Sequence, residues 1–275
     1  MERAERRLIV NADDFGRSSS INAAVIRAHR EGLLTSASLM VNENSCAEAV
    51  ALARENSNLG VGLHVSLVCG KSALAQNEIP RLVNAQNQFS DNAVTSGLKF
   101  FFRPCARRQI FSELEAQFAR FAATGLPLDH VNGHLNIHLH PVVLNILLEN
   151  AARWKIRRLR LTSDPVRFNF QIARGNFLYR ATHGLIYQSL SAWARPKLQR
   201  AGIQFTQNVF GLLQTGRVDE NFLLKLLPRL PSGDSELYSH PSLDEFKHEF
   251  DALISPRVQE LVARNKIQLI RYQDL

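Results

Sequence analysis

Short apolar runs alternate along the chain with longer stretches in which apolar residues recur at three- and four-residue spacing. The short runs are typical of buried β-strands, and they cover residues 7–12, 36–41, 59–67, 128–133, 156–162, 203–211, 235–240 and 267–272. The longer stretches predict amphipathic helices, at residues 20–32, 45–58, 109–125, 242–254 and 255–266. This alternation favours a mostly parallel sheet covered by helices.

The length of the chain decides how such a sheet is arranged. About seven or eight strand–helix units in 275 residues fit an α/β fold, a distorted TIM-like (β/α) barrel of seven or eight mostly parallel strands. A doubly wound open sheet is the alternative, but no Gly-x-Gly-x-x-Gly motif follows any predicted strand. We therefore expect one barrel domain over residues 1–275, with an excursion at about 70–108, where no clear strand pattern is found.

Positive charge is concentrated in a few segments. Lys and Arg outnumber Asp and Glu by 33 to 25, which gives a formal net charge of +8. The charge is densest in residues 100–111, 153–161 and 179–200, and the first and third of these mix it with aromatic residues. This mixture suits a peripheral membrane contact, although a solvated face with long basic side chains explains it as well. No nucleic-acid-binding motif accompanies the charge, so we expect no nucleic-acid partner.

The cysteines and the start of the chain indicate the compartment. Cys46, Cys69 and Cys105 are odd in number and widely spaced, which is typical of free thiols in a reducing environment. The charged start passes directly into a predicted strand, without the apolar segment of a signal peptide. No apolar run approaches the roughly 20 residues that cross a bilayer. We expect a cytoplasmic protein, with peripheral attachment at the inner membrane surface as an alternative.

Candidate chemistry lies at the ends of the predicted strands. Asp13 and Asp14 follow the first apolar run in the sequence LIVNADDFG. A strand-ending turn would explain them, but His64 lies late in the third strand and His134 directly after the fourth. In a barrel these ends meet at one rim. Two imidazoles and one carboxylate suit a divalent metal ion, and among the ions that such ligands admit we expect Mg²⁺ or Zn²⁺.

A hydrolytic metal site would give the two aspartates different tasks. One carboxylate binds the metal, and the other stays off it and takes a proton from the activated water. Neighbouring side chains of a regular strand point to opposite faces, so both can reach one site only if the strand ends there. His240, in the segment ELYSHPS at another strand end, is a candidate acid for the leaving group.

Together these motifs resemble those of the YdjC-like carbohydrate deacetylases. The resemblance runs in order through LIVNADDFG (8–16), GLLTSASLMVN (32–42), VGLHVSL (61–67), HVNGHLNIHLHP (130–141) and SHP (239–241). It implies a distorted (β/α) barrel that uses a divalent metal to hydrolyse N-acetyl groups of amino sugars. By position, it implies that Asp14, His64 and His134 bind the metal. It also implies that Asp13 is the base, and His240 falls where the family carries a His-Pro near the site.

The chain departs from the commonest family pattern at the fourth strand end. The family carries an Asp-Ser-His-x-His run there, whereas this chain has Asn132, Gly133, His134, Leu135 and Asn136. One negative charge and one histidine are lost, so specificity for soluble chito-oligosaccharides is not implied. The form NGHLNIHLHP is similar to the hopanoid-biosynthesis-associated branch, which implies a lipid-linked substrate, an N-acetylglucosaminyl hopanoid.

Other functions stay open at this point. They are a chito-oligosaccharide deacetylase, a phosphoesterase that draws on the Arg cluster at 157–160, and a non-catalytic lipid- or sugar-binding protein. A phosphoesterase would usually bring more carboxylate ligands than the sequence offers. A binding protein leaves the Asp-Asp pair unexplained. The sequence does not define the oligomeric state, and a homo-oligomer is compatible with it.

Overall fold

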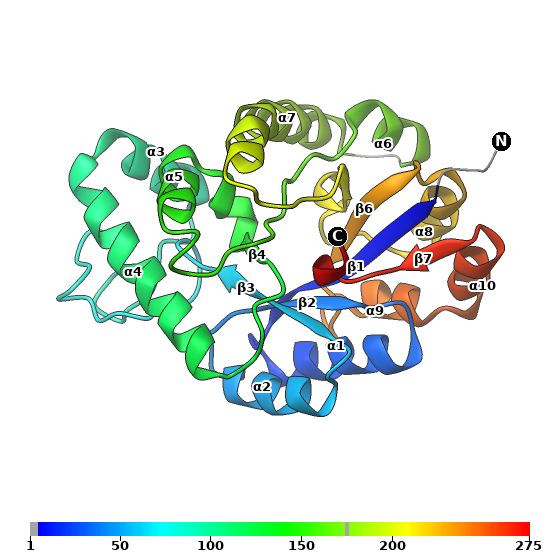
Figure 1. Cartoon of the computed structure of the whole chain (residues 1–275), viewed down its shortest axis with the longest axis horizontal. Coiled ribbons are helices and arrows are strands. Elements are labelled where there is room, and N and C mark those ends of the chain that lie inside the picture. Colours follow the sequence, from blue (N-terminus) through cyan, green and yellow to red (C-terminus); the bar gives the residue numbers. More distant parts are fainter. Residues whose placement is uncertain (1–4, 174–175) are drawn as a thin grey trace.

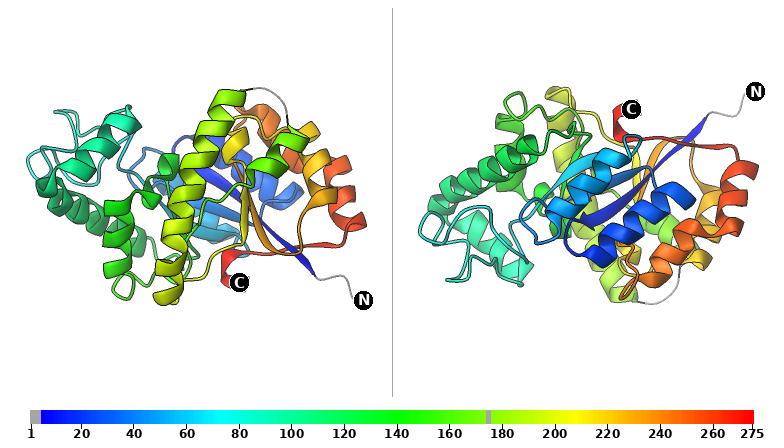
Figure 2. Two further views of the ribbon diagram at one scale, coloured as in Figure 1. Left: turned by 90° about the horizontal axis from the view of Figure 1, so that it is seen from above. Right: turned by 90° about the horizontal axis from the view of Figure 1, so that it is seen from below.

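A parallel sheet forms the centre of the molecule. The computed structural model describes residues 5–173 and 176–275, so residues 1–4 and 174–175 of the expected domain lie outside the described residues. The strands are β1 (Arg6–Phe15), β2 (Ser36–Leu39), β3 (Gly60–Val65), β4 (Val131–Gly133), β5 (Asn208–Phe210), β6 (Gly233–Ser239) and β7 (Ile267–Leu269). Their pairings are all parallel, and helices surround the sheet (Figure 1, Figure 2).

Further backbone contacts bring the edges of the sheet together. The strand order is β4-β3-β2-β1-β6-β5, and β7 pairs with β1. Beyond β4, Val131 forms a parallel bridge with Leu159, and Arg158 forms one with Gln204. The segment that starts at Gln204 continues into β5, which pairs with β6. The sheet is thus parallel and curled, and the predicted fold class, an α/β fold with a distorted TIM-like barrel of mostly parallel strands, is confirmed.

Helices fill the connections between the strands. They are α1 (Ser19–Glu31), α2 (Cys46–Glu55), α3 (Ala93–Phe102), α4 (Pro104–Ala123), α5 (Pro141–Glu149), α6 (Val166–Ile172), α7 (Phe177–Arg200), α8 (Glu220–Leu226), α9 (Lys247–Ile254) and α10 (Pro256–Arg264). A 3₁₀ segment, η1 (His134–Leu139), follows β4 directly. Among the described residues, none of these helices combines the length and the apolar character needed to cross a membrane.

Several predicted elements differ from the observed ones. The strand predicted over 156–162 makes only single bridges, because its neighbour β4 is three residues long and gives way to η1. Helix α4 starts at Pro104 instead of residue 109, since proline suits the first turn of a helix. The pattern missed α3 and α7, because both carry apolar residues on their exposed faces as well as on their buried faces.

A buried ionic network connects the strands. Arg160 is fully buried and donates hydrogen bonds to both carboxylate oxygens of Asp13, at 2.7 and 2.8 Å. It also donates to Glu236 of β6 at 2.8 Å, and the hydroxyl of Tyr272 near the C-terminus donates to the same carboxylate. Buried charges are stable only when they are paired and hydrogen-bonded. The network therefore holds β1, β6, the segment around residue 160 and the C-terminal turn in one arrangement.

The network predicts a large effect of removing its cation. We expect Arg160→Met to lower the free energy of unfolding by about 3–5 kcal/mol, because two buried carboxylates lose their partner. Urea denaturation followed by circular dichroism measures this value. The matched control is Arg157→Met, which changes an exposed arginine three residues away and should cost no more than about 0.5 kcal/mol. Equal stabilities of the two variants would show that the network does not stabilise the fold.

Candidate metal centre and active site

A local distortion of β1 brings the adjacent carboxylates to one place. Asp14 has φ of 63°, a left-handed conformation that is uncommon outside glycine. The pairing of β1 with β2 shifts its register between Ala12 and Phe15, as at a β-bulge. The strand ends at Phe15, one residue after Asp14, within the segment Asp-Asp-Phe-Gly where its end was expected. The irregular backbone at Asp14, rather than the strand end alone, turns the side chains of Asp13 and Asp14 towards one site.

Three side chains converge beyond this distortion. Asp14, His64 and His134 are buried, and each offers one ligand atom within 4.8 Å of the others. Asp14 Oδ1 lies 2.9 Å from His134 Nδ1 and 3.4 Å from His64 Nε2. Atoms bound about 2.1 Å from one cation are about 3.0–3.4 Å apart, so this spacing fits a divalent metal ion. The structure thus brings together the three residues for which the sequence predicted a metal site.

The neighbours of the two imidazoles define their states. Asn132 donates from Nδ2 to Asp13 Oδ1 and to Ser38, so its Oδ1 is free to accept. His64 Nδ1 lies 2.7 Å from that oxygen and is therefore the donor, which leaves Nε2 with its lone pair for a metal.

Burial lowers the pKa of His134, but the Asp14 carboxylate more than offsets this and raises the pKa to about 10. The charge of Asp14 thus favours a positive group here, either a proton or a metal ion.

Asp13 lies beside this triad and is bound differently. Its Oδ1 accepts hydrogen bonds from Asn11, Asn132 and Arg160, whereas its Oδ2 accepts one within the described chain, from Arg160. Burial alone would raise the pKa of Asp13, but the charge of Arg160 and its hydrogen bonds outweigh it and hold the pKa well below its ordinary value. Asp13 is therefore an ionised carboxylate that keeps a lone pair on Oδ2.

His240 belongs to the same cavity. The cavity has a volume of about 380 Å³, and Asp13, His64, His134 and His240 are among its lining residues. The side chain of His240 is 20% exposed, and its Nδ1 lies 3.9 Å from Oε2 of the buried Glu249. The same carboxylate oxygen accepts a hydrogen bond from the His240 backbone. Glu249 therefore faces one edge of the imidazole and positions this residue at the cavity wall.

Most of the other walls are apolar or aromatic. They come from α3, η1, α5 and α7, and the side chains include Ala93, Val94, Leu135, Ile137, Pro141, Tyr179, Ile186, Tyr187 and Leu190. A cavity of this kind holds an apolar group next to a few polar contacts. The polar contacts are provided by the carboxylate and the imidazoles of the site.

His138 and the arginines of the cluster at 157–160 do not line the cavity. His138 is fully buried and its Nε2 donates to the backbone oxygen of Arg160 at 2.9 Å, while burial lowers its pKa to about 3. Arg160 is occupied by two carboxylates. Arg158 donates to the backbone of Gln273, and Arg157 is exposed. The Arg cluster at 157–160 is thus divided between the interior and the surface, which removes the anion site expected for a phosphoesterase.

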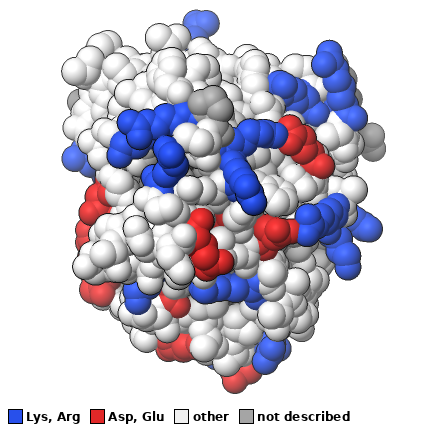
Figure 3. Space-filling view, turned by 90° about the vertical axis from the view of Figure 1, so that its left-hand side faces the viewer, with Lys and Arg blue, Asp and Glu red and all other residues white. Residues whose placement is uncertain are grey.

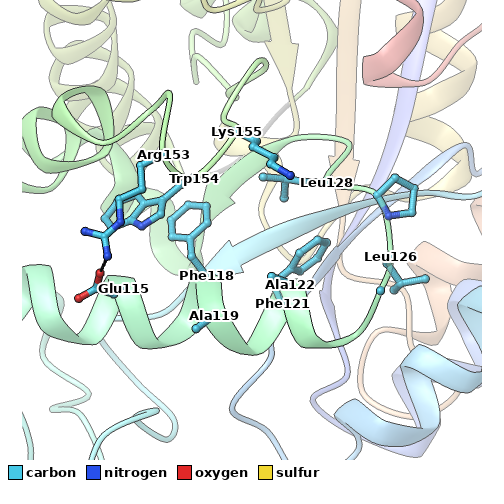
Figure 4. Close-up of a pocket in the computed structure, with 12 residues that line it drawn as sticks. Glu115, Phe118, Ala119, Phe121, Ala122, Leu126, Leu128, Arg153, Trp154 and Lys155 are labelled. Carbon is cyan, nitrogen blue, oxygen red and sulfur yellow. Dashed lines mark hydrogen bonds and ion pairs between the residues drawn. The ribbon is translucent and has the colours of Figure 1, made fainter.

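A larger cavity lies away from this chemistry. It has a volume of about 540 Å³ and lies between α4 and residues 125–128. Figure 4 shows its aromatic walls, with Phe118, Phe121 and Trp154, and the ion pair of Arg153 with Glu115 at one side. Its lining residues include no histidine, cysteine or aspartate. It therefore offers no ligand set for a metal ion, and the smaller cavity is the candidate site.

Sequence reasoning missed two residues that support the site. Arg160 holds Asp13, and Glu249 faces His240. In the sequence, Arg160 is one of several arginines in the strand predicted over 156–162, and nothing distinguished it from its neighbours. An arginine at an otherwise apolar strand position is the signal that could have identified it, because a buried cation needs a buried anion.

Comparison with known proteins identifies the family to which the chain belongs. A family described as YdjC-like protein matches residues 7–264. The chain belongs to the YdjC-like family. A carbohydrate deacetylase from Brevibacillus brevis is 40% identical over 153 residues, which cover 54% of this chain and 57% of that protein. The match therefore spans little more than half of that relative.

Two further proteins match over almost the whole chain. A chitooligosaccharide deacetylase from Serratia marcescens is 29% identical over 279 residues, 98% of this chain and 100% of that protein. A solved structure from Enterococcus faecalis, named for cellobiose-phosphate cleavage, has a TM-score of 0.73 at 21% identity and covers 98% of this chain and 99% of that chain. The second likeness concerns the fold alone.

The triad predicts the effect of losing one ligand. We expect His134→Ala to weaken the binding of Zn²⁺ by about 100-fold or more, since three protein ligands are reduced to two. Isothermal titration of the metal-free protein with Zn²⁺ and with Mg²⁺ measures the affinity. The control is His183→Ala, which changes a cavity-lining histidine outside the triad and should leave the affinity within about twofold. A similar affinity for both variants would place the metal elsewhere.

Proposed function

We propose that this chain is a metal-dependent hydrolase that removes the N-acetyl group from an N-acetylated amino sugar. The observation that carries the proposal is the Asp14–His64–His134 triad beside a second, ionised carboxylate, Asp13, which lines one cavity together with the two imidazoles. Metal-assisted amide hydrolysis uses a Lewis acid and a separate base side by side. The names of the Brevibacillus brevis and Serratia marcescens relatives support a sugar amide as the substrate.

The proposed mechanism gives each side chain one task. A divalent cation, when bound, polarises the acetamide carbonyl and lowers the pKa of a water molecule. Asp13 accepts the proton of the attacking water at Oδ2, the oxygen that keeps a free lone pair, while Arg160 holds the carboxylate in position. His240 protonates the departing amine, with Glu249 facing its other edge. Acetate and a free amino sugar are the products.

The finer proposal concerns what carries the sugar. We propose a lipid-linked substrate, an N-acetylglucosaminyl hopanoid, in keeping with the resemblance of residues 130–141 to the hopanoid-associated branch. The apolar walls from α3 and α7 support it, because an apolar aglycone would bury surface there. The alternative is a soluble chito-oligosaccharide, which the full-length similarity to the Serratia marcescens protein favours.

The role of Asp13 predicts a separation of binding from turnover. We expect Asp13→Asn to bind Zn²⁺ about as tightly as wild type and to lose about 10²–10⁴ in kcat, because an amide cannot accept the proton. Acetate release measures kcat, and titration calorimetry measures metal binding. The matched control is Asp164→Asn, also a buried Asp-to-Asn change but outside the cavity lining. Burial raises the pKa of Asp164 to about 7, so we expect nearly wild-type turnover. Wild-type turnover of Asp13→Asn would overturn the base assignment.

The substrate proposal predicts an order of preference. We expect kcat/KM for acetate release from an N-acetylglucosaminyl lipid to exceed that for N,N′-diacetylchitobiose by about tenfold or more, since the apolar walls contribute only with the lipid. Both substrates are assayed in the same detergent, with and without a chelator. Higher activity on chitobiose would favour the soluble alternative. Full activity in chelator would contradict a metal-dependent reaction on either substrate.

A further inference from the structure

Exposed apolar side chains gather around the mouth of the cavity. Within the described chain, the large exposed hydrophobic residues fall on α3, η1 and α7, and all three segments also line the cavity. These residues, which we call the apolar rim, are Val94, Leu98, Phe101, Phe102, Leu135, Phe177, Leu178, Leu185 and Ile186. Val94, Leu135 and Ile186 belong to both groups. The apolar walls of the cavity therefore continue outward onto the surface.

The rim is organised along its helices. On α3, the exposed residues Val94, Leu98, Phe101 and Phe102 follow each other at spacings of four, three and one, which places them on one face. Phe102 is 70% exposed and Leu178 of α7 is 74% exposed. A soluble helix normally buries such a stripe, so a contiguous exposed one indicates an interaction surface.

The surroundings of the rim are basic. Helices α3 and α7 contain no Asp or Glu. Next to the rim, Lys99 of α3 and Arg103, the residue that follows the helix, are exposed. Figure 3 shows Lys and Arg side chains gathered over the upper part of the end where α3 and α4 lie, with most acidic side chains lower down. An apolar stripe flanked by positive charge is complementary to anionic lipid headgroups.

We propose that the apolar rim and its flanking basic residues dock the protein on an anionic phospholipid membrane. In this arrangement α3 and α7 enter the headgroup region, and the mouth of the cavity opens towards the lipid. A second copy of the chain is a poorer occupant, because a symmetric contact would bring the basic residues of both copies together. The inference rests on the proposed function, whose lipid-linked amino sugar is presented at such an interface.

Docking explains how the cavity would reach its substrate. The sugar would enter as far as the metal triad, while the lipid portion stays against Val94, Leu135 and Ile186 at the mouth. The apolar portion then never has to be exposed to water, and its transfer carries no hydrophobic cost.

Flotation with vesicles tests the proposal. Wild type is mixed with vesicles of phosphatidylglycerol and phosphatidylcholine, or of phosphatidylcholine alone, and we expect binding to the anionic vesicles. Phe101→Ser/Phe102→Ser should weaken it by about tenfold or more, since two inserted rings are lost. Neither ring lines the cavity, so kcat/KM on N,N′-diacetylchitobiose should be unchanged.

A pair of charge variants provides the matched control. Lys99→Gln/Arg103→Gln should weaken binding to anionic vesicles by about 25-fold, because each basic residue near the surface contributes about fivefold. Lys225→Gln/Arg229→Gln removes the same charge from exposed residues of α8 and the turn after it. That variant should bind within about twofold of wild type.

The outcomes separate this proposal from the proposed function. Failure of wild type to bind anionic vesicles, or wild-type binding by Phe101→Ser/Phe102→Ser, would overturn membrane docking. Light scattering that shows a dimer broken by the same variant, without vesicle binding, would assign the rim to a second copy. Vesicle binding without acetate release from either the N-acetylglucosaminyl lipid or N,N′-diacetylchitobiose would contradict the deacetylase proposal and support membrane docking alone.

Discussion

Two neighbouring carboxylates, Asp13 and Asp14, are both buried and both ionised, and the ion pair of Asp13 with Arg160 makes this arrangement stable. When two carboxylates are buried close together, one of them normally takes up a proton. Here each carboxylate has its own positive partner. Arg160 binds Asp13, while the imidazole of His134 and the guanidinium of Arg17 lie against Asp14. Charge pairing therefore gives the two adjacent carboxylates different surroundings, as their proposed roles of base and metal ligand require.

The same ion pair connects the site to the rest of the barrel. Arg160 also binds Glu236, whose other oxygen accepts from Tyr272, and the Tyr272 ring stacks on His130 at 4.2 Å between centroids. His130 in turn contacts Ser38 at 2.9 Å, in the strand next to β1. The C-terminal segment thus supports the site through buried polar contacts, although it lies far from it in sequence. Such contacts fix a geometry because each leaves a costly unpaired group if it breaks.

The sequence could predict the parts that depend on local pattern. Apolar runs followed by Asp14, His64 and His134 were enough to place a metal site at the strand ends, because parallel strands direct their ends to one rim. The left-handed backbone at Asp14 was not predictable, since it depends on the register between β1 and β2. The partner of Arg160 was not predictable either, because it comes from a strand nearly 150 positions away in sequence. The hydrophobic pattern did not predict helices α3 and α7, because their exposed faces are apolar as well. The docking proposal rests on these exposed apolar faces.

The central claim is that Asp14 holds a cation while Arg160 keeps Asp13 off it. Anomalous diffraction from crystals soaked with Zn²⁺ tests this most directly. The account predicts one strong peak at about 2.0–2.2 Å from Asp14 Oδ1 and from one nitrogen each of His64 and His134, with the Asp13–Arg160 pair intact. A peak coordinated by Asp13, or one outside the triad, would contradict it.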